Sequence, residues 1–416
     1  MSDPIVYVHA REVWDSRGLP TVEVEIMTAG GAIGRGIAPA GASTGRREAI
    51  ELRDGGRRLG GRGTRKAVAQ VMEVVAPALR GIAVDDQAGI DATLDGLDDD
   101  PQRSHLGGNT TTAVSLAVAH TAAVSAEVPL WARLGADATF IPRPQIQILG
   151  GGAHAANRVA VQDFMAYPLS ATTITDALSH VAETYLAVGD LLRRRGEPRG
   201  VADEGGHWPE VADTRDALQL IVEGMELAGF RPGTDMGIAL DIAATQFKVE
   251  EGYCIGGRVY STEEWIDELA AFSAEFPIAT IEDPAGEDDS LGMTLAVERL
   301  KSVVVGDDFL VTDERRVTEA ARQHQIGAAL IKVNQAGTVS RAAAAAAAAR
   351  AADVAVIVSA RSGETEDVSV AHLATGWNAD VVKVGSITRG ERTAKWNELI
   401  RIADTAGITR LAPPIG

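Results

Sequence analysis

The chain has 416 residues, of which 45% are hydrophobic and 23% are charged, a composition typical of a globular protein and unlike that of disordered or fibrous chains. Its 39 Lys and Arg against 58 Asp and Glu give a formal net charge of −19, so we expect neither nucleic acid nor an anionic membrane as a partner. The single cysteine, Cys254, excludes an internal disulfide, and no run of about 18 apolar residues occurs; both features favour a cytoplasmic protein.

Residues 1–135 predict a small α+β domain. Within it, residues 21–28 (TVEVEIMT) alternate as a half-buried strand does, and residues 111–124 are typical of a helix of small residues. The glycine-bounded segment 41–49 (GASTGRREA) offers backbone amides and hydroxyls. It suits a lid that carries Ser43 to a pocket, although most such loops are only turns.

Residues 136–416 predict a barrel of the (β/α)8 type, after a link that contains Gly and paired prolines. Apolar, β-branched runs repeatedly end in charged residues and are followed by Ala-rich helical stretches such as residues 341–350, mostly at the spacing of one βα unit. In a parallel barrel the carboxyl ends of the strands converge on one pocket. The six runs are residues 237–241, 278–283, 303–308, 328–335, 354–361 and 381–385, and their polar ends are Asp241, Glu282, Asp307, Lys332, Arg361 and Lys383.

Three of these strand ends are carboxylates, at Asp241, Glu282 and Asp307. Carboxylate oxygens are the hard ligands that Mg²⁺ prefers. Crowded into one pocket, the three would repel each other; a divalent cation relieves that repulsion, whereas without one they would need several buried arginine partners. The sequence therefore predicts a magnesium site at this end of the barrel.

The other strand ends are cationic and suit acid–base chemistry and anion binding. Lys332, crowded by cations and partly desolvated, would have its neutral form favoured, as a general base requires. A salt bridge to one of the carboxylates is the ordinary alternative. Arg361 and Lys383 supply positive charge for a substrate phosphate or carboxylate.

Two further glycine-bounded segments are expected to be loops at the barrel mouth. They are residues 150–164 (GGGAHAANRVAVQDF) and residues 202–209 (ADEGGHWP), which carry His154, Asp163 and Glu204. A lone histidine is more often structural than catalytic, so both roles stay open for His154.

Read in order, the motifs of this chain resemble those of enolase from Arg11 to about Ile402. They are SRGLPTVEVE, GASTG, GGNTT, GGAHA, QDF, DEGG, DIAA, IEDP, GDD, KVNQAGT, ARSGETED and KVGSITRGERTAKWNELIRI. The resemblance implies a small α+β amino-terminal domain on a modified (β/α)8 barrel, usually in a homodimer. It also implies two Mg²⁺ ions per active site and the removal of water from 2-phosphoglycerate through an enolate.

The resemblance also implies a role for each matching position. Asp241, Glu282 and Asp307, called the acid triad below, would hold the tighter metal, and Ser43 on the lid would reach the second metal. Lys332 would abstract the C2 proton, and Glu204 would assist departure of the C3 hydroxyl. The other matching positions would hold the substrate or line its pocket, and they are Arg361, Ser362, Lys383, His154 and Gln162.

Two positions depart from the family's motifs near the substrate. Ala360 stands where the family has His, which opens space, and Asp163 stands where it has a catalytic Glu, which retracts a carboxylate by roughly an ångström. His207, where the family usually has Phe, is a candidate to compensate, and Val384 in place of Thr is a milder change. We therefore expect a changed substrate, a phosphonate analogue giving a carboxyphosphonoenolpyruvate-type product as in antibiotic biosynthesis.

Three alternatives stay open. The protein is an ordinary glycolytic enolase, an enzyme with another enolase-superfamily reaction such as racemisation, or a non-catalytic enolase-like binding protein. The retained acid triad, Lys332, Glu204 and Lys383 argue against the last, and the lid with the DEGG segment favours elimination. We expect a small phosphorylated or phosphonylated acid as substrate and a homodimer or higher homo-oligomer.

Overall fold

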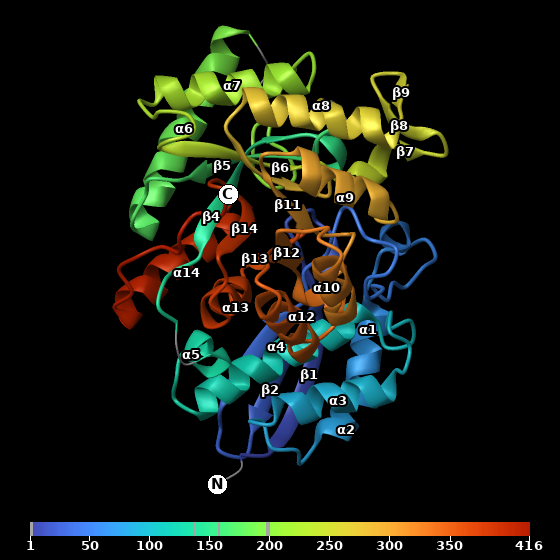
Figure 1. Cartoon of the computed structure of the whole chain (residues 1–416). Coiled ribbons are helices and arrows are strands. Elements are labelled where there is room, and N and C mark those ends of the chain that lie inside the picture. Colours follow the sequence, from blue (N-terminus) through green and yellow to red (C-terminus); the bar gives the residue numbers. More distant parts are fainter. Residues whose placement is uncertain (1–2, 136–137, 157–158, 197–199) are drawn as a thin grey trace.

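The computed structural model of the protein describes residues 3–135, 138–156, 159–196 and 200–416. Figure 1 shows the blue and cyan amino-terminal part below a barrel coloured from green to red. The predicted domain boundary after residue 135 adjoins residues 136–137, which lie outside the described residues.

The amino-terminal part is an antiparallel sheet of order β1-β2-β3 with helices on it. Apolar side chains of the central strand, Val22, Val24 and Ile26, are fully buried, which confirms the alternating strand predicted over residues 21–28. The predicted helix of small residues is also confirmed, as α4. The elements are β1 (Ile5–Trp14), β2 (Pro20–Thr28), β3 (Ile33–Ile37), α1 (Arg65–Gln70), α2 (Ala76–Leu79), α3 (Gln87–Leu97), α4 (Gly108–Ser125) and α5 (Leu130–Leu134).

Helix α4 is buried along almost its whole length because it lies between the sheet and the barrel (Figure 1). Its small residues let β3 come very close: a Cβ added to Gly36 would lie 2.5 Å from the backbone nitrogen of Ala117. Glycine is therefore needed at this crossing. The close contact fixes the strand that leads directly into the lid.

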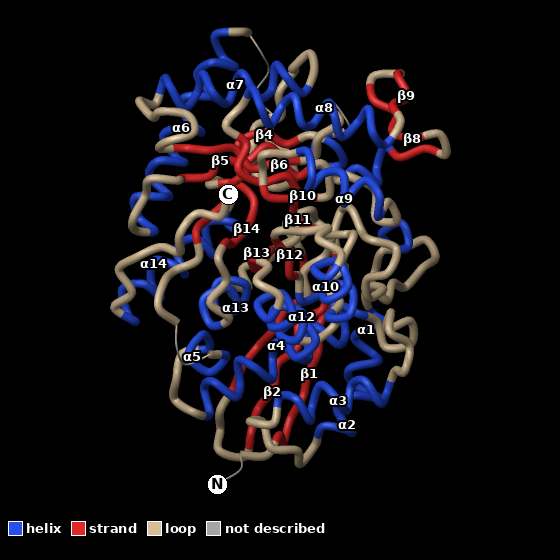
Figure 2. The backbone as a smooth tube through the Cα atoms, in the orientation of Figure 1, coloured by secondary structure: helices blue, strands red, loops and turns tan. Residues whose placement is uncertain are grey.

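The barrel is closed and has the strand order β10-β11-β12-β13-β14-β4-β5-β6 (Figure 2). All six predicted strands are present, and two unpredicted strands, β4 and β5, complete the circle. The six predicted strands pair in parallel, as expected. Strand β5 runs antiparallel to both of its neighbours, so the modification of the (β/α)8 pattern lies at this strand. The strands are β4 (Arg143–Gly150), β5 (Asp163–Pro168), β6 (Met236–Asp241), β10 (Ile278–Glu282), β11 (Val303–Gly306), β12 (Ala328–Ile331), β13 (Ala355–Ser359) and β14 (Val381–Ser386).

Helices surround the barrel and cover the apolar outer faces of its strands (Figure 2). A small hairpin sheet, made of β7 (Lys248–Val249), β8 (Gly252–Ile255) and β9 (Arg258–Tyr260), projects from one side. The helices are α6 (Ile174–Arg194), α7 (Thr214–Leu227), α8 (Thr262–Glu275), α9 (Ser290–Arg299), α10 (Glu314–Arg322), α11 (Val333–Ala336), α12 (Val339–Ala351), α13 (Ser369–Gly376) and α14 (Gly390–Ala406).

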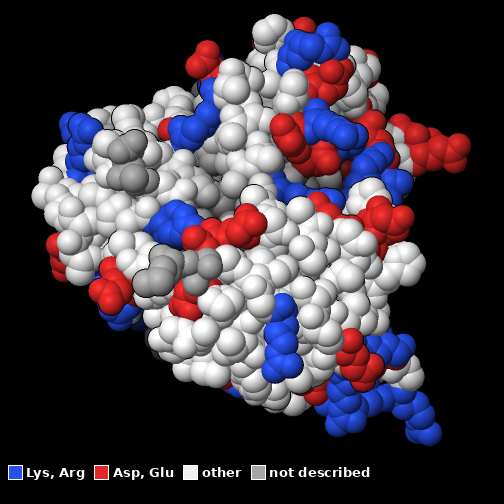
Figure 3. All heavy atoms as spheres, turned by 90° about the horizontal axis from the view of Figure 1, so that it is seen from below, with Lys and Arg blue, Asp and Glu red and all other residues white. Residues whose placement is uncertain are grey.

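Acidic and basic side chains are interspersed with neutral ones on the face seen from below (Figure 3). None of the helices in the described part of the chain combines the length and the apolar character needed to cross a membrane.

The alanine-rich helix α12 begins against the amino-terminal part, which satisfies its first backbone N–H groups. The N–H of Val339 donates to Ser115 Oγ at 2.9 Å, and that of Ser340 donates to Asp91 Oδ2 at 3.0 Å. The cap residue Thr338 accepts the next N–H through its own hydroxyl. Because a helix start leaves such donors unsatisfied, these contacts tie the two parts together.

We predict that Asp91→Ala lowers the free energy of unfolding by about 1–3 kcal/mol, because a buried N–H at the start of α12 loses its acceptor. Urea unfolding followed by circular dichroism measures the change. Asp404→Ala on the exposed side of α14 is the matched control and should change stability by less than about 0.5 kcal/mol. Equal stability of the two variants would contradict the tie between the parts.

Candidate active site

The carboxyl ends of the parallel strands meet at one cavity, which the lid (residues 41–49) also borders. Every predicted site residue except Glu282 and Asp307 lines this cavity, and those two contact the lining residues Lys383 and Lys332. The lining consists of Gly41, Ala42, Ser43, His154, Gln162, Asp163, Glu204, Asp241, Lys332, Ser359, Ala360, Arg361, Ser362 and Lys383.

Two lysines bind the three predicted metal ligands. Asp241 and Glu282 end β6 and β10 and lie opposite each other in the sheet register. The Nζ of Lys383 on β14 donates to Asp241 Oδ2 at 2.8 Å and to Glu282 Oε2 at 2.7 Å. Lys332, directly after β12, donates to Asp307 Oδ2. All five side chains are buried, so the acids take lysine partners rather than the arginines that we considered.

Neighbouring carboxylates favour the charged forms of both lysines. Burial disfavours their charged forms, but Asp241 and Glu282 hold the pKa of Lys383 well above its usual value. Burial acts the same way on Lys332, and Asp307 outweighs it and raises the pKa of this lysine. The salt bridge to a carboxylate, which is the ordinary alternative for Lys332, is therefore the interaction present in this arrangement.

The donor set fits a hard cation. Glu282 Oε1 is buried and has no hydrogen-bond partner among the described residues, and burial together with Asp241 raises the pKa of Glu282 well above normal. An unpartnered carboxylate oxygen beside a second carboxylate is a ligand left over for a metal ion. Asp241, Glu282 and Asp307 would hold Mg²⁺ in competition with the two lysines.

A second layer of polar residues holds Asp307 in place, and the sequence did not reveal it. Asp283 accepts the backbone N–H groups of Asp307 at 2.9 Å and of Asp308 at 2.7 Å. Gln335 donates from Nε2 to Asp307 Oδ1 at 2.9 Å. Ligand atoms of Asp283, Asp307 and Asp308 all lie within 4.8 Å of one another, so acidic oxygen atoms are dense on this side of the site.

In the segment between β4 and β5, His154 links two acids. Its Nδ1 lies 2.8 Å from Asp163 Oδ1, and its Nε2 lies 3.8 Å from Glu204 Oε1. Gln147 on β4 also donates to Asp163, and its own Oε1 accepts the N–H of Gly206 at 2.7 Å. Asp163 is the first residue of β5, so the expectation that it lies on a loop is wrong.

Burial alone would favour neutral forms throughout this group. For His154, Asp163 and Glu204 overcome burial and raise the pKa to about 9. For Glu204, burial and the charge of Asp163 both raise the pKa. The group can therefore store a proton next to the cavity.

The lid is held over the cavity by Arg361. This guanidinium donates to Glu48 at 2.9 Å, to Asn334 Oδ1 at 3.0 Å and to the carbonyl oxygen of Ser43 at 2.9 Å. A Cβ added to Gly41 would lie 2.0 Å from Arg361 Nη2, so glycine lets the lid cross this side chain. Arg361 thus binds the lid itself.

Ala360 and His207, the candidate to compensate for it, lie in different cavities. Ala360 lines the active-site cavity. The ring of His207 stacks on Tyr185, with centroids 4.0 Å apart, and its Nε2 lies 3.0 Å from the Tyr185 carbonyl oxygen. His207 lines a different cavity beside α6 and not the active-site cavity, so this candidate does not fill the space at Ala360.

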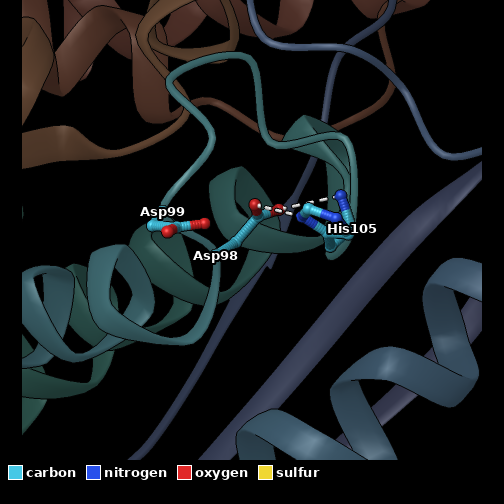
Figure 4. A group of neighbouring side chains, drawn as sticks. All are labelled: Asp98, Asp99 and His105. Carbon is cyan, nitrogen blue, oxygen red and sulfur yellow. Dashed lines mark hydrogen bonds and ion pairs between the residues drawn. The ribbon is translucent and has the colours of Figure 1, made fainter.

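A further acidic group lies away from the barrel (Figure 4). Asp98, Asp99 and His105 have ligand atoms within 4.8 Å of one another. The buried carboxylate of Asp98 accepts the N–H groups of His105 and Leu106 at 3.0 and 2.8 Å, and Oδ1 lies 3.0 Å from His105 Nδ1. Asp98 therefore holds the following loop in place through these contacts, which accounts for the closeness of the three side chains.

Comparison with known families supports the geometry. Residues 5–134 match the family model described as enolase, N-terminal domain, and residues 138–411 match enolase, C-terminal TIM barrel domain. The chain belongs to the enolase family. Enolase membership indicates a hydro-lyase with enolase-type dehydration, and enolases usually use Mg²⁺, which agrees with the buried acids of this site.

We predict that His154 stays protonated at neutral pH. A histidine pKa raised on folding from 6.5 to about 9 stabilises the protein fully below pH 6.5, and this contribution disappears as the pH rises through about 9. Imidazole NMR shifts followed against pH give the pKa directly. In Asp163→Asn the pKa should fall, while exposed His105 should be unchanged; a pKa near 6.5 for His154 in the unaltered protein would contradict the prediction.

Proposed function

We propose that this enolase removes water from a 2-phosphoglycerate-like acid, with Lys332 as the base and Glu204 as the acid. The observation that carries the proposal is that Lys332, Lys383, Asp241 and the His154–Asp163–Glu204 group border one cavity. The other two predicted metal ligands, Glu282 and Asp307, are bonded to the lining lysines Lys383 and Lys332. Such a cavity places a base, an acid and cationic groups around one small anion.

The chemistry begins at C2 of the substrate. Bound Mg²⁺ would neutralise the carboxylates of Asp241, Glu282 and Asp307 and stabilise the negative charge that develops on the substrate carboxylate. If Asp307 became a metal ligand, the Lys332 ammonium would lose its carboxylate partner and release its proton to solvent, and the neutral amine would then accept the proton from C2. Lys383 faces the same cavity and adds a fixed positive charge near the enolate.

Loss of the C3 hydroxyl needs a proton donor. Glu204 suits this role because burial and Asp163 raise its pKa, so that it can hold a proton until the hydroxyl leaves. His154 lies between Glu204 and Asp163 and balances the charge of the pair. Ser43, on the lid, is assigned to the second of two Mg²⁺ ions in this proposal.

We predict that Lys332→Ala slows exchange of the C2 proton by roughly 10²- to 10⁴-fold, because the base is lost. Exchange into deuterated water is followed by NMR, and magnesium binding by calorimetry should persist because Asp307 is freed. Glu204→Gln is the matched control: it should block dehydration and retain C2 exchange. Undiminished exchange in Lys332→Ala would remove Lys332 from the mechanism.

The narrower part of the proposal is a substrate with a larger phosphorus substituent, giving a carboxyphosphonoenolpyruvate-type product. The support is the small side chain of Ala360, which lines the active-site cavity. Ala360 also borders an adjoining cavity of about 40 Å³ between β3 and β13. Asp163 adds to it, because a shorter carboxylate stands where enolases have Glu. An ordinary enolase substrate remains the competing proposal.

We predict that Ala360→His shifts the ratio of kcat/KM values toward 2-phosphoglycerate, and away from a carboxyphosphono analogue, by roughly tenfold or more. The imidazole would occupy space that the larger group uses. Val384→Thr is the control, since Val384 is buried outside the cavity lining, and it should leave the ratio nearly unchanged. Ordinary enolase turnover of 2-phosphoglycerate by the unaltered protein would rule out the specialised substrate.

The competing proposal from another functional class is that the protein binds a ligand without catalysing a reaction. It would be favoured by the absence of magnesium-dependent turnover on a panel of phosphorylated and phosphonylated hydroxy acids.

A further inference from the structure

The lid has a second attachment, at Arg46, which lies along the chain between the two lid residues that Arg361 binds, Ser43 and Glu48. The backbone N–H of Arg46 donates to Glu287 Oε2 at 2.9 Å, and its guanidinium donates to Glu287 Oε1 and to Asp288. Arg47 also pairs with Asp288. We call these four residues the latch. Glu287 and Asp288 follow β10, so the latch joins the lid to the loop behind the predicted metal ligand Glu282.

The four members of the latch are not equivalent. Glu287 has a side chain only 2% exposed, whereas the Arg46 side chain is 67% exposed and that of Asp288 is 40% exposed. Exposed ion pairs contribute little to stability. A buried carboxylate, by contrast, is costly unless both oxygens are bonded, and Arg46 bonds both. Glu287 is therefore the residue on which closure of the latch depends.

The latch and Arg361 hold the lid from two sides. Arg361 binds the carbonyl oxygen of Ser43, and Ser362 Oγ accepts the N–H of Ala42 at 2.6 Å. Arg46 lies three residues after Ser43, and Glu287 binds both its backbone and its side chain. Ser43 is thus fixed between two anchors that come from different barrel loops, and it cannot leave the cavity wall while both are intact.

We propose that Glu287 is a positioning residue, which keeps the lid closed and so keeps Ser43 at the active-site cavity. The part played by Ser43 rests on the proposed function, whereas the closure itself rests only on the contacts of the latch. Opening the lid for substrate exchange would require Arg46 to leave Glu287.

Limited trypsin digestion tests the closure, because the bond after Arg47 lies within the lid. Glu287→Gln keeps the shape but removes the charge, and Arg46→Gln changes only an exposed side chain and guards against misfolding of the first variant. Each should raise the rate of cleavage after Arg47, measured by mass spectrometry, by roughly tenfold or more. Cleavage in the exposed loop around Arg62 and Arg65 is the internal reference.

Glu275→Gln, which breaks the exposed pair of Glu275 with Arg215, is the matched control and should leave lid cleavage unchanged. Unchanged lid cleavage in both latch variants would overturn the proposal. The latch variants should also raise KM for the acid substrate more than they lower kcat. Cleavage does not depend on turnover, so a protein inactive on every acid would overturn the proposed function and leave the latch result standing.

Discussion

Burial of opposite charges at the strand ends is the constraint on which the site depends. Three carboxylates, Asp241, Glu282 and Asp307, meet two ammonium groups, and none of the five could remain charged alone in this environment. Three carboxylates share two ammonium groups, so burial and Asp241 raise the pKa of Glu282 well above normal, and Glu282 Oε1 has no hydrogen-bond partner among the described residues. The protein has therefore built a site that is satisfied only in part by its own side chains and that favours a further cation.

The antiparallel strand extends this site to residues that a parallel barrel could not supply in the same way. Because β5 runs against its neighbours, its first residue, Asp163, lies at the same rim as the last residue of β6, and Asp163 pairs with Asp241 in the register. Proton storage by His154, Asp163 and Glu204 is thus placed beside the acids that would hold the metal. One reversed strand thus brings the His154–Asp163–Glu204 group next to the predicted metal ligand Asp241.

The same reversal explains what the sequence could and could not predict. The rule that charged residues follow apolar runs found six strands and their polar ends, since those ends share one rim. It could not find Asp163 as a strand residue, because the charge there precedes its apolar run. The alternation of Gln145 and Gln147 with apolar neighbours is the local signal for β4. Partners such as Glu48 and Arg361, 313 residues apart, are set by tertiary packing and leave no local pattern.

The two departures from the family's motifs act on different parts of the molecule. Asp163 is held by His154 and Gln147, so the shorter side chain remains inside a bonded network and its charge still reaches Glu204. Ala360 has no such network and changes only the space available. The cavity behind it is flanked by Glu364 and Asp367, whose carboxylates already accept backbone N–H groups. Glu364 also pairs with Lys395 Nζ at 3.0 Å, so an anionic substituent would meet two carboxylates there whose partners are already bound. A larger phosphorus group is therefore better placed in the active-site cavity, which Ala360 and Lys383 both line.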